Sequence, residues 1–237
     1  MTLTKQTFIR PVDYSRDRSA LDNIFRVTCG NSLKIEPAWT ISSYLWCHPY
    51  PQLSPATCFV LDSGAGEAVG YILGTPDTAS FAEEWKSQFL PSLDQQLLPR
   101  PPDYAARGEE KPSWSEDLPG HLLNLVYNDY PELLNLYRPG ILERWPAHLH
   151  IDILPSHQRQ GWGRKLIDTF FDAVVERGSK GVHLGMEAGN TGSLRFYEAL
   201  GFSRYPHVLD GGSSRETGRT DEGSEGVIYL VRDLEGA

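Results

Sequence analysis

The chain has 237 residues, of which 40% are hydrophobic, and a formal net charge of −9 at pH 7. This length allows a full hydrophobic core in one domain or at most two small ones. The acidic balance argues against a nucleic-acid partner, because phosphate binding needs a clustered excess of Lys and Arg. The amino terminus has no apolar run of signal-peptide length, and no segment approaches the roughly 18 apolar residues of a membrane span. We therefore expect a cytoplasmic protein without a membrane partner.

The cysteines predict neither a disulfide framework nor a metal site. Cys29, Cys47 and Cys58 are an odd number and form no CxxC pair. That usage indicates neither paired cystines nor zinc ligands. We expect reduced, mostly buried thiols and no bound metal.

The first 75 residues predict a strand, two helices and a hairpin. Residues 7–12 alternate apolar and polar side chains, and residues 13–29 carry apolar side chains at helical spacing. Residues 39–47 suit a short second helix. Two apolar runs, 56–62 and 67–75, flank a Gly-rich turn and predict an antiparallel strand pair.

Residues 76–146 have a different character, with ten of the seventeen prolines and three of the six tryptophans of the chain. About 70 residues are too many for an ordinary loop. Residues 78–93 and 120–134 show helical apolar spacing, with an acidic, Pro-rich piece at 98–120 between them. We expect a helical insertion with one irregular segment.

The remainder of the chain alternates strands and helices. The sequence predicts, in order, a strand at 147–154, an amphipathic helix at 162–178, a strand at 181–187, a helix at 190–202, and closing strands at 202–209 and 227–234 around a Gly/Ser-rich loop at about 210–226. One side of the first helix is apolar at Leu166, Ile167, Phe170, Phe171 and Val174. This order predicts an α/β (α+β layered) fold with a mixed sheet.

The loop from Gln158 to Gly163 separates a predicted strand from a predicted helix. Its glycines would let backbone N–H groups converge on a phosphate at the helix N-terminus. A lone Gly-x-Gly also serves simply as a tight turn. The loop lacks the GKT or GKS ending of a P-loop and the third glycine of the Rossmann fingerprint, which argues against nucleotide hydrolysis and hydride transfer.

Two motifs carry a resemblance to a known superfamily. ILPSHQRQGWGRKLI resembles the Q/R-x-x-G-x-G/A acyl-CoA loop of the GNAT N-acetyltransferases, and N-x-x-S-x-x-F-Y-x-x-x-G-F at 190–202 is similar to their closing motif. The two motifs stand in the superfamily's order and separation, and the resemblance covers residues 148–202. It implies a single GNAT domain over 1–237, with a mixed twisted sheet flanked by helices and the insertion at 76–146 between strands 3 and 4.

The resemblance implies acetyl-CoA as cosubstrate and a set of residues that hold it. The backbone of Ile151, Asp152 and Ile153 would pair with the pantetheine arm. Asn190 would also bind this arm. The pyrophosphate would lie against Gln158, Arg159, Gln160, Gly161, Trp162, Gly163 and Arg164.

Tyr197 is the candidate general acid. Attack by an amine on the thioester expels a thiolate, and a phenol can supply the proton or hydrogen bond that stabilises it. The residue could equally be a core aromatic beside Phe196, and Asn190 an ordinary helix cap. Their joint position in the motif favours function.

His148, His150 and Asp152 are the candidate bases, because an amine must lose a proton before it attacks. Strict alternation places them on one face of the strand, which we expect not to be buried core. The strand is similar to the two-histidine strand of serotonin N-acetyltransferases, although these histidines stand one residue closer to the loop. Each histidine could instead be structural, and Asp152 could orient a histidine or bind a cationic amine. Glu187 is a further carboxylate, with simple solvent exposure as its alternative.

A second resemblance concerns HLHIDILP and the insertion after YILGTPDTASF. Both look like a fungal and bacterial GNAT branch related to the acetyltransferase-like domain of O-GlcNAc hydrolases, which makes amino sugars conceivable acceptors. We therefore expect an enzyme that moves an acetyl group directly to a small-molecule amine, with a homodimer left open. The alternatives are a non-catalytic acyl-CoA-binding module and a protein or histone lysine acetyltransferase. Trp85, Trp114 and Trp145 either shape the acceptor pocket or anchor the insertion.

Overall fold

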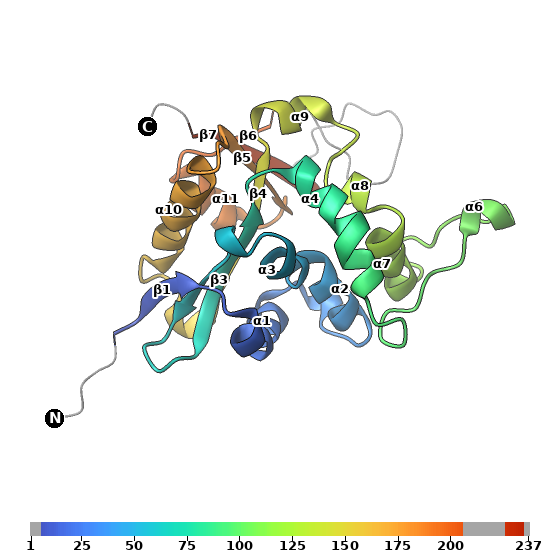
Figure 1. Ribbon diagram of the computed structural model, residues 1–237, viewed down its shortest axis with the longest axis horizontal. Coiled ribbons are helices and arrows are strands. Elements are labelled where there is room, and N and C mark those ends of the chain that lie inside the picture. Colours follow the sequence, from blue (N-terminus) through green and yellow to red (C-terminus); the bar gives the residue numbers. More distant parts are fainter. Residues whose placement is uncertain (1–5, 206–225, 235–237) are drawn as a thin grey trace.

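The computed structural model of the protein describes residues 6–205 and 226–234 (Figure 1). Its strands are β1 (Phe8–Pro11), β2 (Phe59–Asp62), β3 (Ala68–Thr75), β4 (Ala147–Ile153), β5 (Gly181–Glu187), β6 (Ser203–Arg204) and β7 (Val227–Asp233). They form a seven-stranded sheet in the order β1-β2-β3-β4-β5-β7-β6. Only the β4–β5 pair is parallel, and the other neighbours are antiparallel. The predicted mixed sheet is confirmed.

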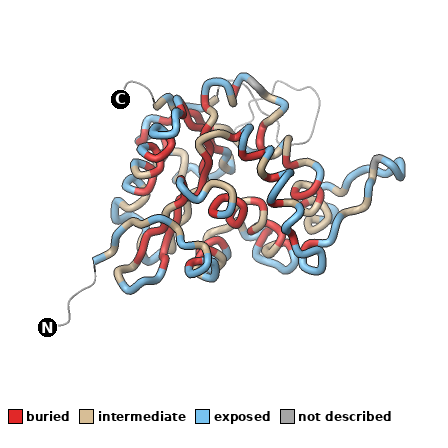
Figure 2. The backbone as a smooth tube through the Cα atoms, in the orientation of Figure 1, coloured by how far each residue is buried: buried red, intermediate tan, exposed pale blue. Residues whose placement is uncertain are grey.

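Helices cover both faces of the sheet (Figure 1). One face packs against α10 (Trp162–Val175) and α11 (Thr191–Glu198). The other packs against α1 (Tyr14–Thr28) and α3 (Pro49–Leu53), while α2 (Ala38–Trp46) and α7 (Leu118–Tyr127) pack against each other in the same apolar cluster. Buried residues follow the sheet and the inward sides of these helices (Figure 2). The sheet therefore separates two apolar clusters, as expected for an element that buries apolar side chains on each face.

The N-terminal elements form where the sequence predicts them. Asp13 caps α1 by accepting a hydrogen bond from the backbone N–H of Arg16, which satisfies one of the free donors of a helix start. Short α3 was not predicted from the sequence. Pro49 stands in its first turn, where the missing N–H costs nothing.

The insertion between β3 and β4 is helical, as predicted. Its elements are α4 (Thr78–Glu84), a π-helical turn η3 (Trp85–Phe89), α5 (Leu90–Ser92), α6 (Tyr104–Arg107), α7, α8 (Tyr130–Leu133) and α9 (Pro139–Arg144). Trp85 is fully buried, stacks on Tyr130, and donates its indole N–H to the carbonyl of Val126. This tryptophan anchors the insertion's helices to one another. Trp114 is 42% exposed at the edge of the irregular segment.

The C-terminal half confirms the predicted helix faces and stops. All five apolar residues predicted for α10 are buried. Gly178 and Gly201 adopt φ values of 85° and 83° just beyond α10 and α11, the left-handed conformation that commonly ends a helix and favours glycine. Most of the predicted Gly/Ser-rich loop, and the end of the strand predicted at 202–209, fall outside the described residues.

The described residues contain no group of His, Cys, Asp and Glu that could hold a metal ion. The three thiols are free, with Cys47 and Cys58 buried and Cys29 half-buried. In the ranges 6–205 and 226–234, no helix is long and apolar enough to cross a membrane.

Candidate active site

The parallel strands β4 and β5 separate along most of their length. They pair only at Ala147 with Val182 and at His148 with His183. Beyond that point β5 continues beside β7 as far as Glu187, while β4 continues beside β3 as far as Ile153. The later residues of β4 therefore have one edge without a neighbouring strand among residues 6–205 and 226–234.

The open edge presents the backbone of Ile151. The N–H of Leu154 donates to the carbonyl of Val69, which fixes the even-numbered residues of β4 as those bonded to β3. Ile151 and Ile153 therefore direct their N–H and C=O groups toward the gap. The carbonyl of Ile153 accepts a hydrogen bond from Gln158 Nε2 at 2.7 Å, which leaves Ile151 as the freer of the two for an extended ligand.

Two residues of the following loop adopt left-handed backbone conformations. Arg159 has φ 58° and Gly161 has φ 82°, and Gly161 directly precedes α10 without a side-chain cap. A Cβ atom at Gly161 would meet no atom within 4 Å. The first N–H groups of α10 thus have no side-chain acceptor, and the Cβ side of Gly161 beside them is open, which suits an anion at a helix N-terminus.

Gly163 is required for packing rather than for an open approach. A Cβ atom there would lie 3.0 Å from the ring of Phe196 on α11. The missing side chain lets α10 and α11 come together. A contact of the Gly163 backbone with the pyrophosphate stays a prediction.

The side chains of other loop residues interact with neighbouring residues of the protein. Gln160 Nε2 donates to the Ser156 carbonyl at 2.9 Å, and an Arg164 guanidinium nitrogen donates to the Ala199 carbonyl at 3.1 Å. The Lys165 ammonium lies over the ring of Trp162, 4.2 Å from the ring centroid. Lys165 is a basic group of the α10 N-terminus that the sequence analysis did not name.

Asn190 and Tyr197 lie on α11, beside the gap. Asn190 Oδ1 caps the helix by accepting the Ser193 N–H at 3.0 Å, so its amide N–H groups remain available. Tyr197 is buried and packs edge-on against Phe196 and Phe202. Burial, together with the charge of Asp152, raises the pKa of the Tyr197 phenol. The phenol therefore stays protonated and can donate.

Asp152 lies on the opposite face of β4 from Ile151. The hydroxyl of Tyr71, on β3, donates to Asp152 Oδ2 at 2.7 Å. Burial raises the pKa of Asp152 to about 6, although the hydrogen bonds from Tyr71 and Thr28 oppose that rise. A carboxylate with this pKa is ionised at neutral pH yet basic enough to accept a proton.

The two histidines differ in access. His148 is buried, and both its ring nitrogens have partners, Tyr50 at 3.0 Å and Thr78 at 2.7 Å. His150 is only half-buried, and its Nε2 lies 2.9 Å from the Tyr50 hydroxyl. The expectation that this face of β4 is not buried core is therefore wrong at His148, because α3 and the insertion cover it.

Glu187 ends β5 on the far side of the gap. The residue is exposed, and its Oε1 is 3.3 Å from where a Cβ atom of Gly30 would stand. Glu187 thus reaches the segment after α1, at the rim of the same region.

Comparison with known proteins identifies the family. The model of the acetyltransferase (GNAT) family matches residues 122–202. The crystal structure of SsHAT is 31% identical, covers 97% of this chain and 98% of that chain, and has a TM-score of 0.75. The chain belongs to the acetyltransferase (GNAT) family. The predicted family and fold class are confirmed, and with the family come the enzyme class, an acyltransferase, and the cosubstrate, acetyl-CoA.

Two other relatives are more distant. The ribosomal protein bS18-alanine N-acetyltransferase of Escherichia coli (strain K12) is 37% identical over 54 residues, 23% of this chain and 36% of that protein. The chain thus matches about a third of the length of that curated relative. PH1933 from Pyrococcus horikoshii OT3 is 13% identical with a TM-score of 0.53 over 96% of this chain, which shows the fold alone. The finer resemblance to the domain of O-GlcNAc hydrolases stays a prediction.

The GNAT site includes residues that sequence reasoning missed. Tyr50, Tyr71 and Thr78 each hydrogen-bond a candidate base. The contact of Tyr71 could have been anticipated, because Tyr71 lies in the predicted strand 67–75. A strand that pairs with 147–154 must place some of its side chains beside the candidate bases. Tyr50 and Thr78 gave no such signal, since a strand pattern does not indicate which helices cover it.

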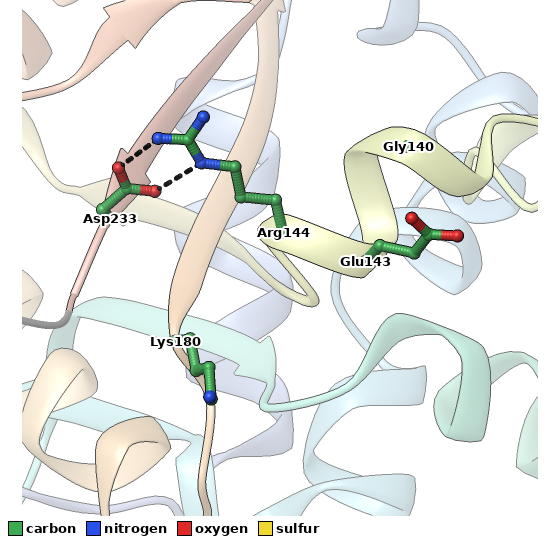
Figure 3. A pocket seen from close by; sticks show the side chains of 5 residues that line it. All are labelled: Gly140, Glu143, Arg144, Lys180 and Asp233. Atoms are coloured by element: carbon green, nitrogen blue, oxygen red, sulfur yellow. Dashed lines mark hydrogen bonds and ion pairs between the residues drawn. The ribbon is translucent and has the colours of Figure 1, made fainter.

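A separate pocket lies at the other end of β5 from the GNAT site. It has a volume of about 470 Å³ and is lined by Gly140, Glu143, Arg144, Lys180 and Asp233. Figure 3 shows the Arg144 guanidinium turned onto the Asp233 carboxylate, at 2.7 Å. Its charged lining belongs to the junction of α9 with β7, away from Asp152 and Tyr197.

Proposed function

We propose that this GNAT acetyltransferase moves an acetyl group from acetyl-CoA directly to the primary amine of a small molecule. The observation that carries the proposal is the open edge of β4, where Asp152, the proposed base, lies on the acceptor face. Tyr197, the proposed acid, is protonated and close enough for the charge of Asp152 to raise its pKa. An acid and a base with separated pKa values, on two sides of one gap, suit amine acylation.

The donor side fits acetyl-CoA. The unpaired edge at Ile151 offers backbone groups to an extended pantetheine, and Gly161 leaves space beside the first N–H groups of α10 for a pyrophosphate. Acetyl-CoA supplies an activated thioester. The Ile151 N–H would hold its carbonyl oxygen, where negative charge develops during attack.

The proton transfers follow from the positions of the side chains. Asp152 takes a proton from the ammonium form of the acceptor, which frees the nitrogen lone pair for attack on the thioester carbonyl. The C–N bond forms as the C–S bond breaks, Tyr197 donates its proton to the departing sulfur, and the second proton lost by the acylated nitrogen restores the phenol. His150, next along the same face, accepts a hydrogen bond from the acceptor amine.

The coverage of β4 favours a small acceptor. Tyr50 and Phe81 stack over the face that carries His148, with ring centroids 4.8 Å apart. Phe81 belongs to the insertion, which therefore narrows the acceptor side of the sheet. An amino sugar or another compact cationic amine suits this space and the carboxylate at its edge.

A protein amine is the second candidate. The Escherichia coli relative is described as acting on an alanine of a ribosomal protein, and the match to it supports a peptide N-terminus as the alternative acceptor. The chain matches only 36% of that relative, so this support is weaker than that from the enclosed acceptor face.

The test is a panel assay that follows free thiol release from acetyl-CoA. The panel contains amino sugars, polyamines, arylalkylamines, amino acids, Ala-starting peptides and histone peptides. We expect turnover with a small amine. Turnover with peptides alone would favour the second candidate, and tight acetyl-CoA binding without turnover on any acceptor would sink the enzymatic proposal.

A further inference from the structure

Four hydrogen bonds form a continuous chain beside the acceptor face. His150 Nε2 lies 2.9 Å from Tyr50 Oη, which lies 3.0 Å from His148 Nε2. His148 Nδ1 lies 2.7 Å from Thr78 Oγ1, which lies 2.6 Å from the Pro146 carbonyl oxygen. The chain joins β4 to α3 and to the first residue of the insertion's α4.

The direction of the chain is fixed at its buried end. A carbonyl oxygen only accepts, and a threonine hydroxyl carries one proton. Two oxygens 2.6 Å apart, at Thr78 and Pro146, need that proton between them. Thr78 Oγ1 must therefore accept from His148 Nδ1, which makes Nδ1 the protonated nitrogen of His148.

The donor and acceptor directions at His148 also determine the protonated nitrogen of His150. With its proton on Nδ1, neutral His148 has a bare Nε2, which accepts the single proton of the Tyr50 hydroxyl. The Tyr50 oxygen can then bond His150 only as an acceptor, so His150 carries its proton on Nε2. Its Nδ1 is left bare and makes no hydrogen bond to any described residue.

We propose that Tyr50 and Thr78 are positioning residues that hold His150 in the Nε2–H tautomer, so that its Nδ1 lone pair serves as a hydrogen-bond acceptor at the edge of the acceptor site. The role of this lone pair toward an amine rests on the proposed function. The tautomer itself does not, because it follows from the hydrogen-bond directions between neutral histidines.

The surroundings keep the histidines neutral, as the argument requires. Burial lowers the pKa of His148 well below its usual range, and burial together with His183 lowers that of His150 to about 4. His183 lies beside His148, with ring centroids 5.6 Å apart, and its Nδ1 is 2.6 Å from the Trp145 carbonyl oxygen. Within the described part of the protein, neither His148 nor His150 has a carboxylate among its hydrogen-bond partners.

The chain orients groups rather than conducting protons. It ends at the Pro146 carbonyl, which cannot take a proton onward. Phe81 stacks on Tyr50 with an interplanar angle of 14°, which fixes the ring of the central residue. Among the described residues, Trp39 Nε1 is the sole side-chain nitrogen or oxygen that is both fully buried and without a hydrogen-bond partner. His150 Nδ1 also lacks a partner, so it cannot be fully buried and is accessible to solvent.

The decisive experiment is nitrogen NMR of the histidine rings in the intact protein. Protonated and bare ring nitrogens resonate apart, and the His150 signals are those lost in His150→Gln. We expect the Nε2–H tautomer in the wild type. Tyr50→Phe removes the acceptor and should leave a mixture of both tautomers. Thr78→Val should also erode the bias, two hydrogen bonds away, and it tests the idea should Tyr50→Phe fail to fold.

Tyr14→Phe is the matched control, because the Tyr14 hydroxyl hydrogen-bonds His48 Nδ1 at 3.1 Å and takes no part in the hydrogen-bond chain from His150 to Pro146. It should leave the His150 tautomer unchanged. An Nδ1–H tautomer of His150 in the wild type, or the same tautomer in Tyr50→Phe and Thr78→Val as in the wild type, would overturn the proposal. Where an acceptor is known, kcat/KM should fall by roughly 10- to 10⁴-fold in Tyr50→Phe, the upper figure being the loss when a histidine's orienting residue is altered. Absence of any acetyl transfer would count against the proposed function and leave the tautomer measurement valid.

Discussion

Tyr71 and Asp152 face each other across strands β3 and β4, with the phenol donating to the carboxylate at 2.7 Å. On the face that carries the candidate bases, Tyr71 is buried and Asp152 is half-buried, and this burial raises the pKa of each. The hydrogen bond stabilises the ionised carboxylate and so limits the rise at Asp152. One phenol thus tunes the group that we propose as the base.

The ionisation of Asp152 should control the acid side of the pH profile. With a pKa of about 6, the carboxylate is protonated and inactive below pH 6 and ionised above it. For an amine that stays protonated over this range, kcat/KM should rise with pH and level off above about 6. In Asp152→Asn this limb should vanish and kcat/KM should fall by roughly 10²-fold or more. A wild-type profile that is flat between pH 4 and 8 would contradict the assignment.

Tyr71→Phe should move that limb toward alkaline pH. Removing one of the two donors to the charged form weakens the opposition to the effect of burial, so the pKa of Asp152 rises further. The measurement is again kcat/KM against pH, with Tyr14→Phe as the control for loss of a phenol on the same side of the sheet. A shift toward acid, or no shift, would show that Tyr71 does not tune Asp152.

Tyr197→Phe tests the other side of the gap. The hydroxyl forms no hydrogen bond to any described residue, so its loss should barely change stability. Turnover should fall by roughly 10²-fold, the lower range for a lost general acid, while acetyl-CoA affinity stays within a few-fold of the wild type. Calorimetric titration and steady-state kinetics separate the two effects. Tyr137→Phe, at a 76% exposed position, should be silent, and a fully active Tyr197→Phe would remove the phenol from the mechanism.

The fold was predictable wherever the signal is local. Alternation predicted a strand at 147–154, and helical spacing predicted a helix at 162–178. Both signals depend on residues close in sequence, and both elements appear, as β4 (Ala147–Ile153) and α10 (Trp162–Val175). Gly178 and Gly201 stop their helices because only the nearest backbone decides their conformation. Short helices that begin with proline, such as α3 and α9, were missed because the same residues also suit turns.

The site was predictable only in part, because its environment is non-local. The pattern placed His148 and His150 on one face correctly, but their shared partner Tyr50 is 98 residues from His148 in sequence. Nothing in the strand indicates that α3 and the insertion cover one histidine more than the other. Gly163 shows the same limit, since its contact with Phe196 depends on how two helices pack.

Gly161 and Gly178 offer a matched pair for separating backbone strain from ligand binding. Their φ values are 82° and 85°, and a Cβ atom would meet nothing within 4 Å at either. Valine at each position should cost about 1–2 kcal/mol or more through the left-handed backbone. Both variants should lose similar melting temperature, but only Gly161→Val should lose acetyl-CoA binding. Equal affinities in the two variants would argue against a pyrophosphate at this loop.

The ion-pair network at Arg10 predicts how stability depends on pH. Arg10 is 14% exposed and bonds Asp17 at 2.6 Å and Asp62 at 2.8 Å, both of which are 2% exposed. Burial alone would raise the pKa of each carboxyl, yet the hydrogen bonds from Arg10 help to bring both below the usual value of 3.8. This stabilisation is therefore fully present above pH 4 and is lost as pH falls through the lowered folded-state pKa values.

Arg10→Met should strand two buried carboxylates and cost about 3–5 kcal/mol of unfolding free energy at neutral pH. The deficit should shrink as pH falls toward 3, because protonation removes the stranded charge. Arg144→Met is the control, since Arg144 and its partner Asp233 are 63% and 49% exposed and such a pair is worth about 0–1 kcal/mol. Thermal unfolding of both variants against pH makes the comparison. A deficit at Arg10 that does not change with pH would mean that lost packing of its aliphatic stem, rather than its charge, sets the cost.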